Sequence, residues 1–308
     1  MTIVPPVPGE PRRPFGPRDP GDAWVEAPDG ARYWGRFGAA GLLALDAQRG
    51  VLLQHRVSWS HFGDTWGLPG GARHEGESAV DGALREATEE AGVPQTAVRP
   101  RLVSMFDLGY WSYATLVADV TEPFEATIGD PESHALEWVP IDDVLDRPLH
   151  PGFEASWAHL KASLDLRPAV VVDAANVVGA VPDGWWKDRA GATQRLLGRI
   201  ETLAARGISA DVLGLAEQRW YPEWRVVVEG RARGMAQGDP ATASSFVDVV
   251  RAAASGDDAI AAETARLVNE GRTVTVVTSD RGLADRVGQA GAIVRGARWL
   301  LDLMAGLS

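Results

Sequence analysis

The sequence predicts an α/β protein built from two domains. Its 308 residues exceed the usual size of a single domain, and 45% of them are hydrophobic, which is enough for two buried cores. Short apolar strands alternate with helical segments, and a new apolar strand begins directly after Leu166-Arg167-Pro168. We therefore expect domains at residues 22–166 and 168–308, preceded by a disordered tail over residues 1–21.

The tail is expected because closely spaced prolines disfavour both helices and sheets. The prolines that define it are Pro5, Pro6, Pro8, Pro11, Pro14, Pro17 and Pro20. The segment has no basic stretch followed by an apolar run, so we do not expect a secretory signal. No apolar stretch reaches the length of about 18 residues that would indicate a membrane span.

The composition narrows the class of function. The net charge is −12 and the acidic residues are concentrated in the first half, so general attraction to nucleic acid is not expected. The chain contains no cysteine, which excludes disulfides and thiolate sites. This composition fits a reducing compartment, and we expect a cytoplasmic protein.

The first domain is expected to contain a mixed sheet between helices. Residues 39–47 and 50–56 predict a hairpin around Gln48-Arg49-Gly50. Residues 101–109, 110–120 and 135–139 have the length and composition of strands. Residues 140–144 open a helical turn, and residues 153–164 predict a closing helix with Trp157 and Leu160 facing inward.

The second domain is expected to contain a mainly parallel sheet. Residues 169–173 predict its first strand, and further strands are predicted at residues 208–216, 224–232, 247–253, 273–278 and 292–295. Helices are predicted at residues 257–269, between the last two strands, and at residues 298–304. Apolar β-branched runs separated by helices are typical of parallel sheets.

A glycine turn and the helix after it carry the strongest chemical signal, over residues 70–93. At about 100° per residue, Glu86, Glu89 and Glu90 project from one side of a helix within an arc of about 100°. Like charges at this spacing repel, so a bound divalent cation is the simplest explanation for them. Gly92 predicts the end of the helix.

This stretch resembles the Nudix box, G-x5-E-x7-R-E-U-x-E-E-x-G-U, in which U is apolar. Every fixed position is filled without insertion or deletion, with Ala87 at the first apolar position: Gly71, Glu77, Arg85, Glu86, Glu89, Glu90, Gly92 and Val93. The preceding loop, residues 66–71, is also typical of Nudix hydrolases. The resemblance covers about residues 22–166. It implies an α/β/α sandwich and hydrolysis of a nucleoside diphosphate derivative.

The resemblance also implies roles for the box residues. Glu86 and Glu90 would bind Mg²⁺ or Mn²⁺, and Glu89 would share that role or position water. The carbonyl oxygen of Gly70 would be a further ligand. Arg85 would orient the glutamates through charge-assisted hydrogen bonds. Solvated glutamates on a surface helix are the alternative, but agreement at so many fixed positions favours a site.

Other candidates lie around the box. In several Nudix enzymes the general base lies on a later loop, so Glu132 in the loop at residues 128–133 is our candidate, with Glu137 second. A loop acid that is only solvated is the alternative. Glu77 is expected to order the turn before the helix. His61 and His74 flank the site, and we expect both to be surface residues.

The substrate class follows from the family and the charge. The acidic domain argues against polymeric RNA. We therefore expect a small nucleotide: a nucleoside triphosphate, an oxidised one, or a sugar or dinucleotide diphosphate. Five aromatic residues could stack on a base or belong to the core, namely Trp59, Phe62, Tyr110, Trp111 and Tyr113.

The second domain places acids after its predicted strands. Ligand sites of α/β sheets form at the carboxyl ends of parallel strands. This arrangement resembles PIN/NYN-like domains, a family that contains metal-dependent ribonucleases, and the matching residues are Asp173, Asn176, Asp257, Asp258 and Asp280. The acid expected in an early helix is matched only by Asp188. Capping of helices and turns is the alternative reading of these aspartates.

Three functions remain open at this point. The leading one is a Mg²⁺-dependent Nudix pyrophosphohydrolase fused to a PIN-like domain. In the second, the PIN-like domain is the main ribonuclease and the Nudix domain trims ends or senses nucleotides. In that case Trp185 and Trp186, beside Lys187 and Arg189, could stack on RNA bases; packing against the domain interface is the alternative for both. In the third, the second domain is a scaffold without catalytic activity.

Overall fold

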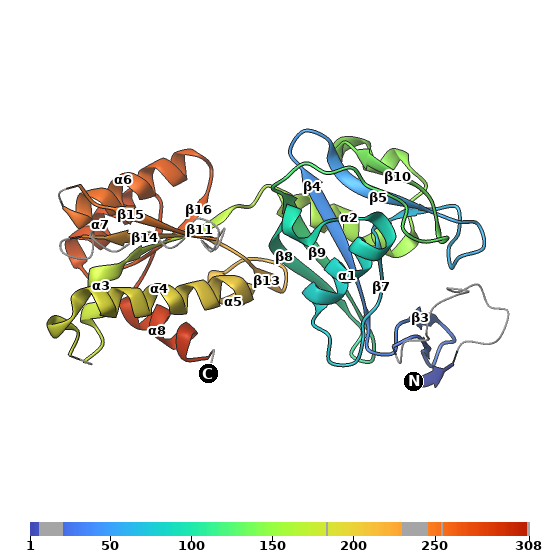
Figure 1. The fold of residues 1–308 in the computed structure, drawn as a ribbon, viewed down its shortest axis with the longest axis horizontal. Coiled ribbons are helices and arrows are strands. Elements are labelled where there is room, and N and C mark those ends of the chain that lie inside the picture. The colour runs from blue at the N-terminus through green and yellow to red at the C-terminus, as the bar shows by residue number, and fades with distance from the viewer. Residues whose placement is uncertain (6–20, 183, 230–245, 254, 307–308) are drawn as a thin grey trace. The chain divides into compact units, whose positions relative to one another are not determined.

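The chain forms two compact units. The structure is a computed structural model that describes residues 1–5, 21–182, 184–229, 246–253 and 255–306. The first unit consists of Met1–Leu164 and Leu215–Arg219 (Figure 1). The second consists of Asp165–Gly214 and Trp220–Ser308. No helix within the described residues is long and apolar enough to cross a membrane.

The first unit contains ten strands, two α-helices and two 3-10 turns among the described residues. The strands are β1 Thr2–Val4, β2 Trp24–Glu26, β3 Arg32–Trp34, β4 Ala39–Asp46, β5 Gly50–Arg56, β6 Trp66–Gly67, β7 Gly70–Ala72, β8 Val98–Asp107, β9 Ser112–Val120 and β10 Ser133–Val139. The helical elements are α1 Ala79–Ala91, η1 Gln95–Ala97, η2 Ile141–Asp146 and α2 Pro151–Leu164.

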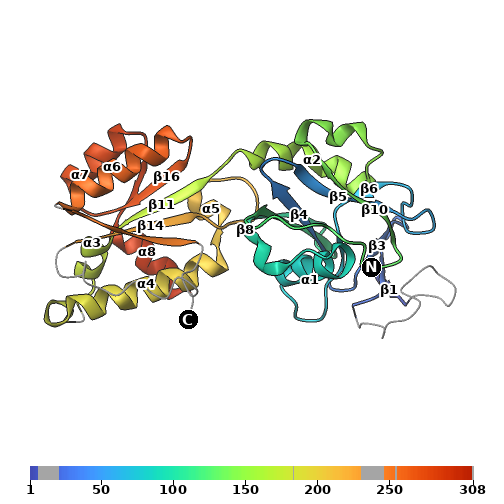
Figure 2. The same ribbon diagram turned by 45° about the horizontal axis from the view of Figure 1, so that its top comes forward.

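The main sheet of the first unit is mixed, as predicted. Its strands follow the order β10-β5-β4-β9-β8. Strand β4 runs parallel to β9, whereas β4 and β5, β5 and β10, and β8 and β9 pair in antiparallel fashion. Helices α1 and α2 lie on opposite sides of this sheet (Figure 2). The predicted helix at residues 153–164 is confirmed, and it buries Phe153, Trp157 and Leu160.

The beginning of the chain differs from the expected tail. Residues 2–4 form strand β1, which pairs with β2 in a small sheet that continues to β3. Thr2, Ile3 and Val4 are β-branched, which favours a strand, and they form one edge of this sheet. The proline count did not reveal this strand. The rest of the predicted tail, residues 6–20, lies outside the described residues.

The second unit contains a five-stranded sheet and helices on both faces. Its strands are β11 Pro168–Asp173, β12 Ile208–Ser209, β14 Glu223–Val228, β15 Val247–Arg251, β16 Thr273–Val277 and β17 Ile293–Arg295, with β13 Arg219–Trp220 at the junction of the units. Its helical elements are α3 Ala174–Gly179, η3 Trp185–Lys187, α4 Arg189–Arg206, α5 Ala210–Leu213, α6 Gly256–Asn269, α7 Arg281–Gln289 and α8 Ala297–Ala305.

The predicted parallel sheet is present in the second unit. Its order is β15-β14-β11-β16-β17, and every neighbouring pair is parallel. Helices α6 and α7 cover one face, and α3, α4 and α8 cover the other (Figure 1). Val171 faces the α6 side, where it packs in one core with Leu267 and Leu283. Strand β11, which contains Val171, is buried on both faces, and this explains its uninterrupted apolar sequence.

Two predicted segments have a different structure. Residues 208–216 are not one strand, because Ser209 begins the short helix α5 and Gly214 ends it in a left-handed conformation. The loop predicted at residues 66–71 contains the two short strands β6 and β7, which pair with β5 and β4. Residues 230–232, at the end of the strand predicted from 224, lie outside the described residues.

Candidate active site

Helix α1 presents the acidic residues of the box against the sheet. The Ser78 hydroxyl accepts a hydrogen bond from the Asp81 amide at the N-terminus, and Gly92, with φ of 64°, ends the helix. Ala83, Ala87 and Ala91 are fully buried. Because these side chains are small, the helix packs closely on β4 and β9. Glu86 and Glu90 are therefore buried on the side of the helix that faces the sheet, while Glu89 is exposed.

Arg85 joins several of the predicted site residues. Its guanidinium donates to both carboxylate oxygens of Glu77, at 2.8 and 2.9 Å, and to Glu86 Oε1 at 2.7 Å. A further hydrogen bond reaches the carbonyl oxygen of Ala72 at 3.0 Å, and Glu89 lies 3.6 Å away. The hydrogen bonds from Arg85 hold the pKa of Glu77 below its ordinary value of 4.5. Arg85 thus fixes the turn to the helix.

Glu90 is a buried acid that lies close to two other carboxylates. Only 5% of it is exposed, and its Oε2 accepts hydrogen bonds from the Gly70 amide at 2.9 Å and from Gln54 Nε2 at 3.3 Å. Burial raises the pKa of Glu90 well above its ordinary value of 4.5, and the charges of Glu86 and Asp130 raise it further. A buried carboxylate beside two others is costly unless a cation compensates it.

The glycine turn allows a carboxylate to approach the backbone. A Cβ atom on Gly71 would lie 2.8–2.9 Å from the carboxylate atoms of Glu86, closer than real side chains allow. Only glycine fits at this position without displacing Glu86. Neighbouring Gly70 contributes its N–H group to Glu90, as described above. Gly71 is thus required by the close approach of Glu86 in α1 to β7.

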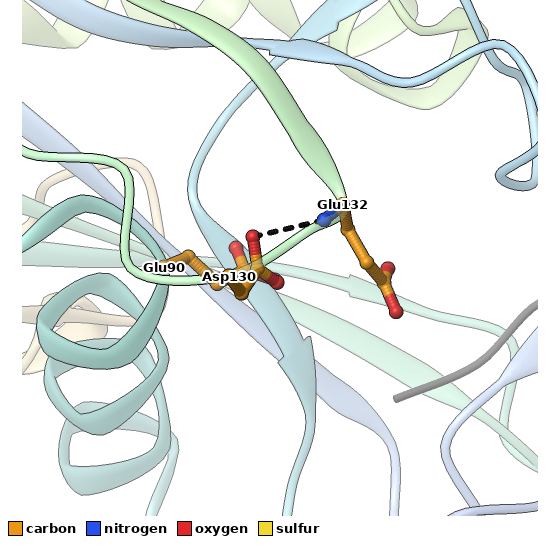
Figure 3. A group of neighbouring side chains, drawn as sticks. All are labelled: Glu90, Asp130 and Glu132. Atoms are coloured by element: carbon orange, nitrogen blue, oxygen red, sulfur yellow. Dashed lines mark hydrogen bonds between the residues drawn. The ribbon is translucent and has the colours of Figure 1, made fainter. Parts of the chain in front are cut away.

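The side chains of Glu90, Asp130 and Glu132 lie close together, and we refer to these three residues as the carboxylate group (Figure 3). One oxygen of each carboxylate lies within 4.8 Å of the others. A backbone hydrogen bond also joins the helix to the candidate loop, since the Gly129 amide donates to the Glu90 carbonyl oxygen at 3.0 Å. Glu132 is therefore close to the box. Sequence reasoning missed Asp130, although its position two residues before Glu132 in a Gly-Asp-Pro-Glu turn could have indicated it.

The other predicted acids and histidines lie in different surroundings. Glu137 is paired with Arg147 at 2.7 Å. His61 packs edge-on against Trp24. The backbone amide of His74 donates to Glu77. None of these three residues belongs to the carboxylate group that the described residues form.

The candidate aromatic residues divide into packed and exposed sets. Trp111 stacks on Tyr33 with ring centroids 4.6 Å apart, and Tyr110 packs edge-on against the same ring. Tyr113 is confined, because a Cβ atom on Gly41 would overlap its hydroxyl group.

Trp59 and Phe62 are 43% and 47% exposed, so they remain available to contact another molecule. Both lie in the segment between β5 and β6. The Val57 amide anchors this segment to the carbonyl oxygen of Glu132 at 3.0 Å. The two exposed rings therefore belong to a loop that is attached to the carboxylate group.

Acids of the second unit lie at one end of its sheet. Asp173 ends β11 and is 9% exposed, with Oδ1 accepting from the Asn176 amide and Oδ2 from the Thr278 hydroxyl. Burial raises the pKa of Asp173, and Asp257 and Glu229 act in the same direction.

Three further acids of this unit hold local structure. Asp280 and Asp188 cap helices α7 and α4, and Asp258 pairs with Arg286 at 2.6 Å. Among the described residues, the second-unit acids do not form a tight carboxylate group like that of the first unit.

Comparisons with known proteins decide the family of the first unit. The NUDIX domain model matches residues 35–160. A putative 8-oxo-dGTP diphosphatase 3 of Mycobacterium tuberculosis is 47% identical over 156 residues, which cover 47% of this chain and 71% of that relative. The chain belongs to the Nudix hydrolase family. It is therefore a hydrolase of phosphoanhydride bonds.

Other Nudix proteins match a similar share of the chain. A nucleoside triphosphate pyrophosphatase/Nudix hydrolase fusion protein of Bifidobacterium longum is 40% identical over 154 residues, 47% of this chain and 32% of the relative. The crystal structure of the Nudix hydrolase RenU of M. smegmatis has 45% identity and a TM-score of 0.44. It covers 47% of this chain and 95% of that one.

Proposed function

We propose that residues 22–166 form a Mg²⁺-dependent pyrophosphohydrolase of nucleoside triphosphates, with an oxidised purine triphosphate as the first substrate to test. The observation that carries this proposal is the gathering of Glu90, Asp130 and Glu132 beside a complete Nudix box. The substrate class is supported by the names of the two curated relatives above. We also propose that the protein is cytoplasmic, as its cysteine-free composition suggests.

The residues present fit a divalent cation. Glu90 is buried next to Glu86 and Asp130, and this arrangement raises its pKa, as expected where a cation normally compensates like charges. Carboxylate oxygens are the ligands that Mg²⁺ prefers, and Mn²⁺ accepts them as well. We assign the cation to Glu86, Glu89 and Glu90, with the Gly70 carbonyl oxygen as a further ligand. When bound, the cation would neutralise phosphate charge and make water more acidic.

The side chains would divide the remaining work. Glu132 is our candidate general base, because it is a partly buried loop acid of the carboxylate group, whereas Oδ2 of the other loop acid, Asp130, is buried. Arg85 keeps Glu86 oriented through the hydrogen bond described above. The water oxygen would bond to a phosphorus atom of the substrate while the bond to the bridging oxygen breaks. The proton would go to the base and the electron pair to the leaving phosphate.

Trp59 and Phe62 are our candidates for contact with the base. They are exposed aromatic residues on a segment anchored to Glu132. Aromatic stacking on a base does not require a particular pattern of hydrogen bonds, so it fits a pocket that accepts a modified purine. Tyr110 and Trp111 fit this role less well, because both pack against Tyr33.

A substrate panel tests the proposal. We expect the full chain with Mg²⁺ to convert 8-oxo-dGTP to a monophosphate and pyrophosphate faster than it converts dGTP, ADP-ribose or a dinucleoside polyphosphate. Pyrophosphate and phosphate should be measured separately, with the Glu90→Gln protein as control. Turnover of ADP-ribose without turnover of any triphosphate would contradict the proposed substrate class.

A second candidate function concerns residues 168–308, which we propose form a PIN/NYN-like ribonuclease domain. The strand order places β11 at the centre. The chain continues from β11 to β14 on one side of it, whereas β16 on the other side continues outward to β17. Ligand sites of open α/β sheets form at the carboxyl ends of strands at such a reversal. Buried Asp173 ends β11, with Asn176 beside it and Asp280 after β16. A scaffold role for this unit is the alternative.

The ribonuclease is tested in a chain whose first unit is inactive. With Glu90→Gln in the background, we expect the full chain with Mn²⁺ to cleave labelled single-stranded RNA, and Asp173→Asn to remove that cleavage. Asp211→Asn is a matched control, because Asp211 is exposed and lies in the first turn of α5. Cleavage that persists in Asp173→Asn, or that is absent from the parent protein, would favour the scaffold.

A further inference from the structure

The loop at residues 127–133 is docked on the last turn of helix α1. The amides of Thr127 and Gly129 donate to the carbonyl oxygens of Ala91 and Glu90, each at 3.0 Å. Carbonyl groups in the last turn of a helix have no partner within the helix, so the loop supplies one. A Cβ atom on Gly129 would overlap the carbonyl oxygen of Glu89. The loop therefore depends on a glycine for its close approach.

This docking places Asp130 next to Glu90, and the two carboxylate oxygens of Asp130 have different surroundings. Oδ1 accepts from the Glu132 amide at 3.2 Å and from the Ser133 hydroxyl at 3.0 Å, which forms the local turn. Oδ2 is buried and has no hydrogen-bond partner among the described residues. Leaving a buried polar atom unpaired is costly, so this oxygen calls for a partner from outside the chain.

A buried amide side chain, that of Gln54, also has an oxygen atom that is unpaired within the described part of the chain. Gln54 is fully buried, and its Nε2 donates to Glu90 Oε2 at 3.3 Å and to the Ser133 hydroxyl at 2.7 Å. Its Oε1 is also buried without a hydrogen-bond partner among the described residues. The helix acid, the loop acid and a strand amide thus converge, and two of their oxygen atoms remain unsatisfied. Oxygen atoms of this kind are the donors that hard divalent cations take.

We propose that Asp130 is a cation ligand of this enzyme, acting through Oδ2 together with Glu90, and that the docked loop holds it in place. The inference rests on the proposed Mg²⁺-dependent hydrolase. It extends the ligand set beyond the box to a residue some 40 positions later in the sequence. In this assignment Asp130 has two tasks, because Oδ1 shapes the loop while Oδ2 contributes charge at the site.

The Asp130→Asn variant separates these tasks. Asparagine keeps an Oδ1 acceptor for the Glu132 amide and the Ser133 hydroxyl, but it replaces Oδ2 with a group that cannot bind a cation. We expect the full chain to lose affinity for Mn²⁺ by about tenfold or more, measured by the electron paramagnetic resonance signal of free Mn²⁺. Thermal unfolding in EDTA would check that the variant is folded.

Two further proteins define the site and the control. Glu90→Gln identifies which part of the total Mn²⁺ binding belongs to this site. Asp29→Asn is the matched control, because Asp29 Oδ1 also accepts from a backbone amide two residues on, in an exposed turn of the same unit. If Asp130→Asn binds Mn²⁺ like wild type while Glu90→Gln does not, the assignment of Asp130 is overturned. If Glu90→Gln also binds like wild type, the proposed function itself fails.

A second variant tests the docking. Gly129→Ala changes no carboxylate residue, but it forces the loop that carries Asp130 away from the Glu89 carbonyl oxygen. We expect a loss of Mn²⁺ affinity similar to that of Asp130→Asn. Gly198→Ala is its control, because a Cβ atom there meets nothing within 4 Å. Wild-type Mn²⁺ binding by the folded Gly129→Ala protein would show that the docked loop does not position Asp130.

Discussion

Glu90→Gln should lower the rate of Mg²⁺-dependent hydrolysis by about 10³-fold, the order of loss seen when one group that stabilises transition-state charge is removed. Glutamine has nearly the same shape and keeps an acceptor for the hydrogen bonds from Gly70 and Gln54. It lacks the negative charge that would attract a cation. The measurement is the initial rate of pyrophosphate release at saturating substrate.

The same change should stabilise the metal-free protein at neutral pH. The pKa of Glu90 in the folded protein lies above its ordinary value of 4.5, so the folded state holds a proton more tightly than the unfolded state. Stability from this group is therefore present below pH 4.5 and is lost as the pH rises through the raised pKa. Glutamine removes this loss. The advantage of the variant should grow from pH 4.5 toward neutrality.

Calorimetric unfolding in EDTA over a pH series would measure this effect, with enzyme activity followed in parallel. A variant that kept wild-type hydrolysis would show that the Glu90 charge is not used in the reaction. A variant that was less stable than wild type at neutral pH would show that Glu90 contributes through its hydrogen bonds rather than suffering from the neighbouring charges.

Arg85→Ala should damage both stability and activity. Arg85 hydrogen-bonds Glu77, Glu86 and the Ala72 carbonyl oxygen, and the two glutamate side chains are only 13% and 6% exposed. Removing Arg85 leaves these buried carboxylates without the guanidinium that pairs with them, which should lower the free energy of unfolding by roughly 3 kcal/mol. Hydrolysis should fall by about 100-fold, because Glu86 loses its orientation. Arg85→Lys should not restore the wild-type rate, since lysine cannot donate two parallel hydrogen bonds.

Arg49→Ala provides the matched control for this prediction. Arg49 donates to Asp46 Oδ2 through both Nε, at 3.0 Å, and Nη2, at 2.9 Å, in the turn between β4 and β5. It should lose stability while keeping its rate of hydrolysis. Calorimetry can resolve the first unit if the two units unfold separately. Equal losses of activity in both variants would mean that Arg85 acts only through general stability.

The parts of the fold that could be predicted are those set by local sequence. Strand β11 is a continuous apolar run, and helix α1 has its cap, its small face and its terminal glycine within 15 residues. The segment at residues 208–216 was predicted wrongly because its apolar positions resemble a strand, whereas Ser209 and Gly214 form the boundaries of a short helix. Helix α4 was not predicted as an element, although its amphipathic pattern marks it.

The candidate site also has a part that the local sequence predicts and a part that it does not. The relative positions of Glu86, Glu89 and Glu90 follow from spacing within one helix, so the sequence determines them. The neighbours of Glu90 come from distant segments. Gln54 lies on β5, and Asp130 precedes β10, which pairs with β5 through a shifted register at residues 133–135. Such contacts depend on how strands pair, and residue spacing does not reveal this.

The central position of β11 has a consequence for synthesis of the chain. Its residues 169–173 pair with β14, which begins at Glu223, and its residues 168–172 pair with β16, which begins at Thr273. The strand therefore leaves the ribosome roughly 50 residues before one partner and roughly 100 before the other. During that interval a valine-rich segment has no sheet to join. The nascent C-terminal half is thus exposed to aggregation until β14 and β16 have been made.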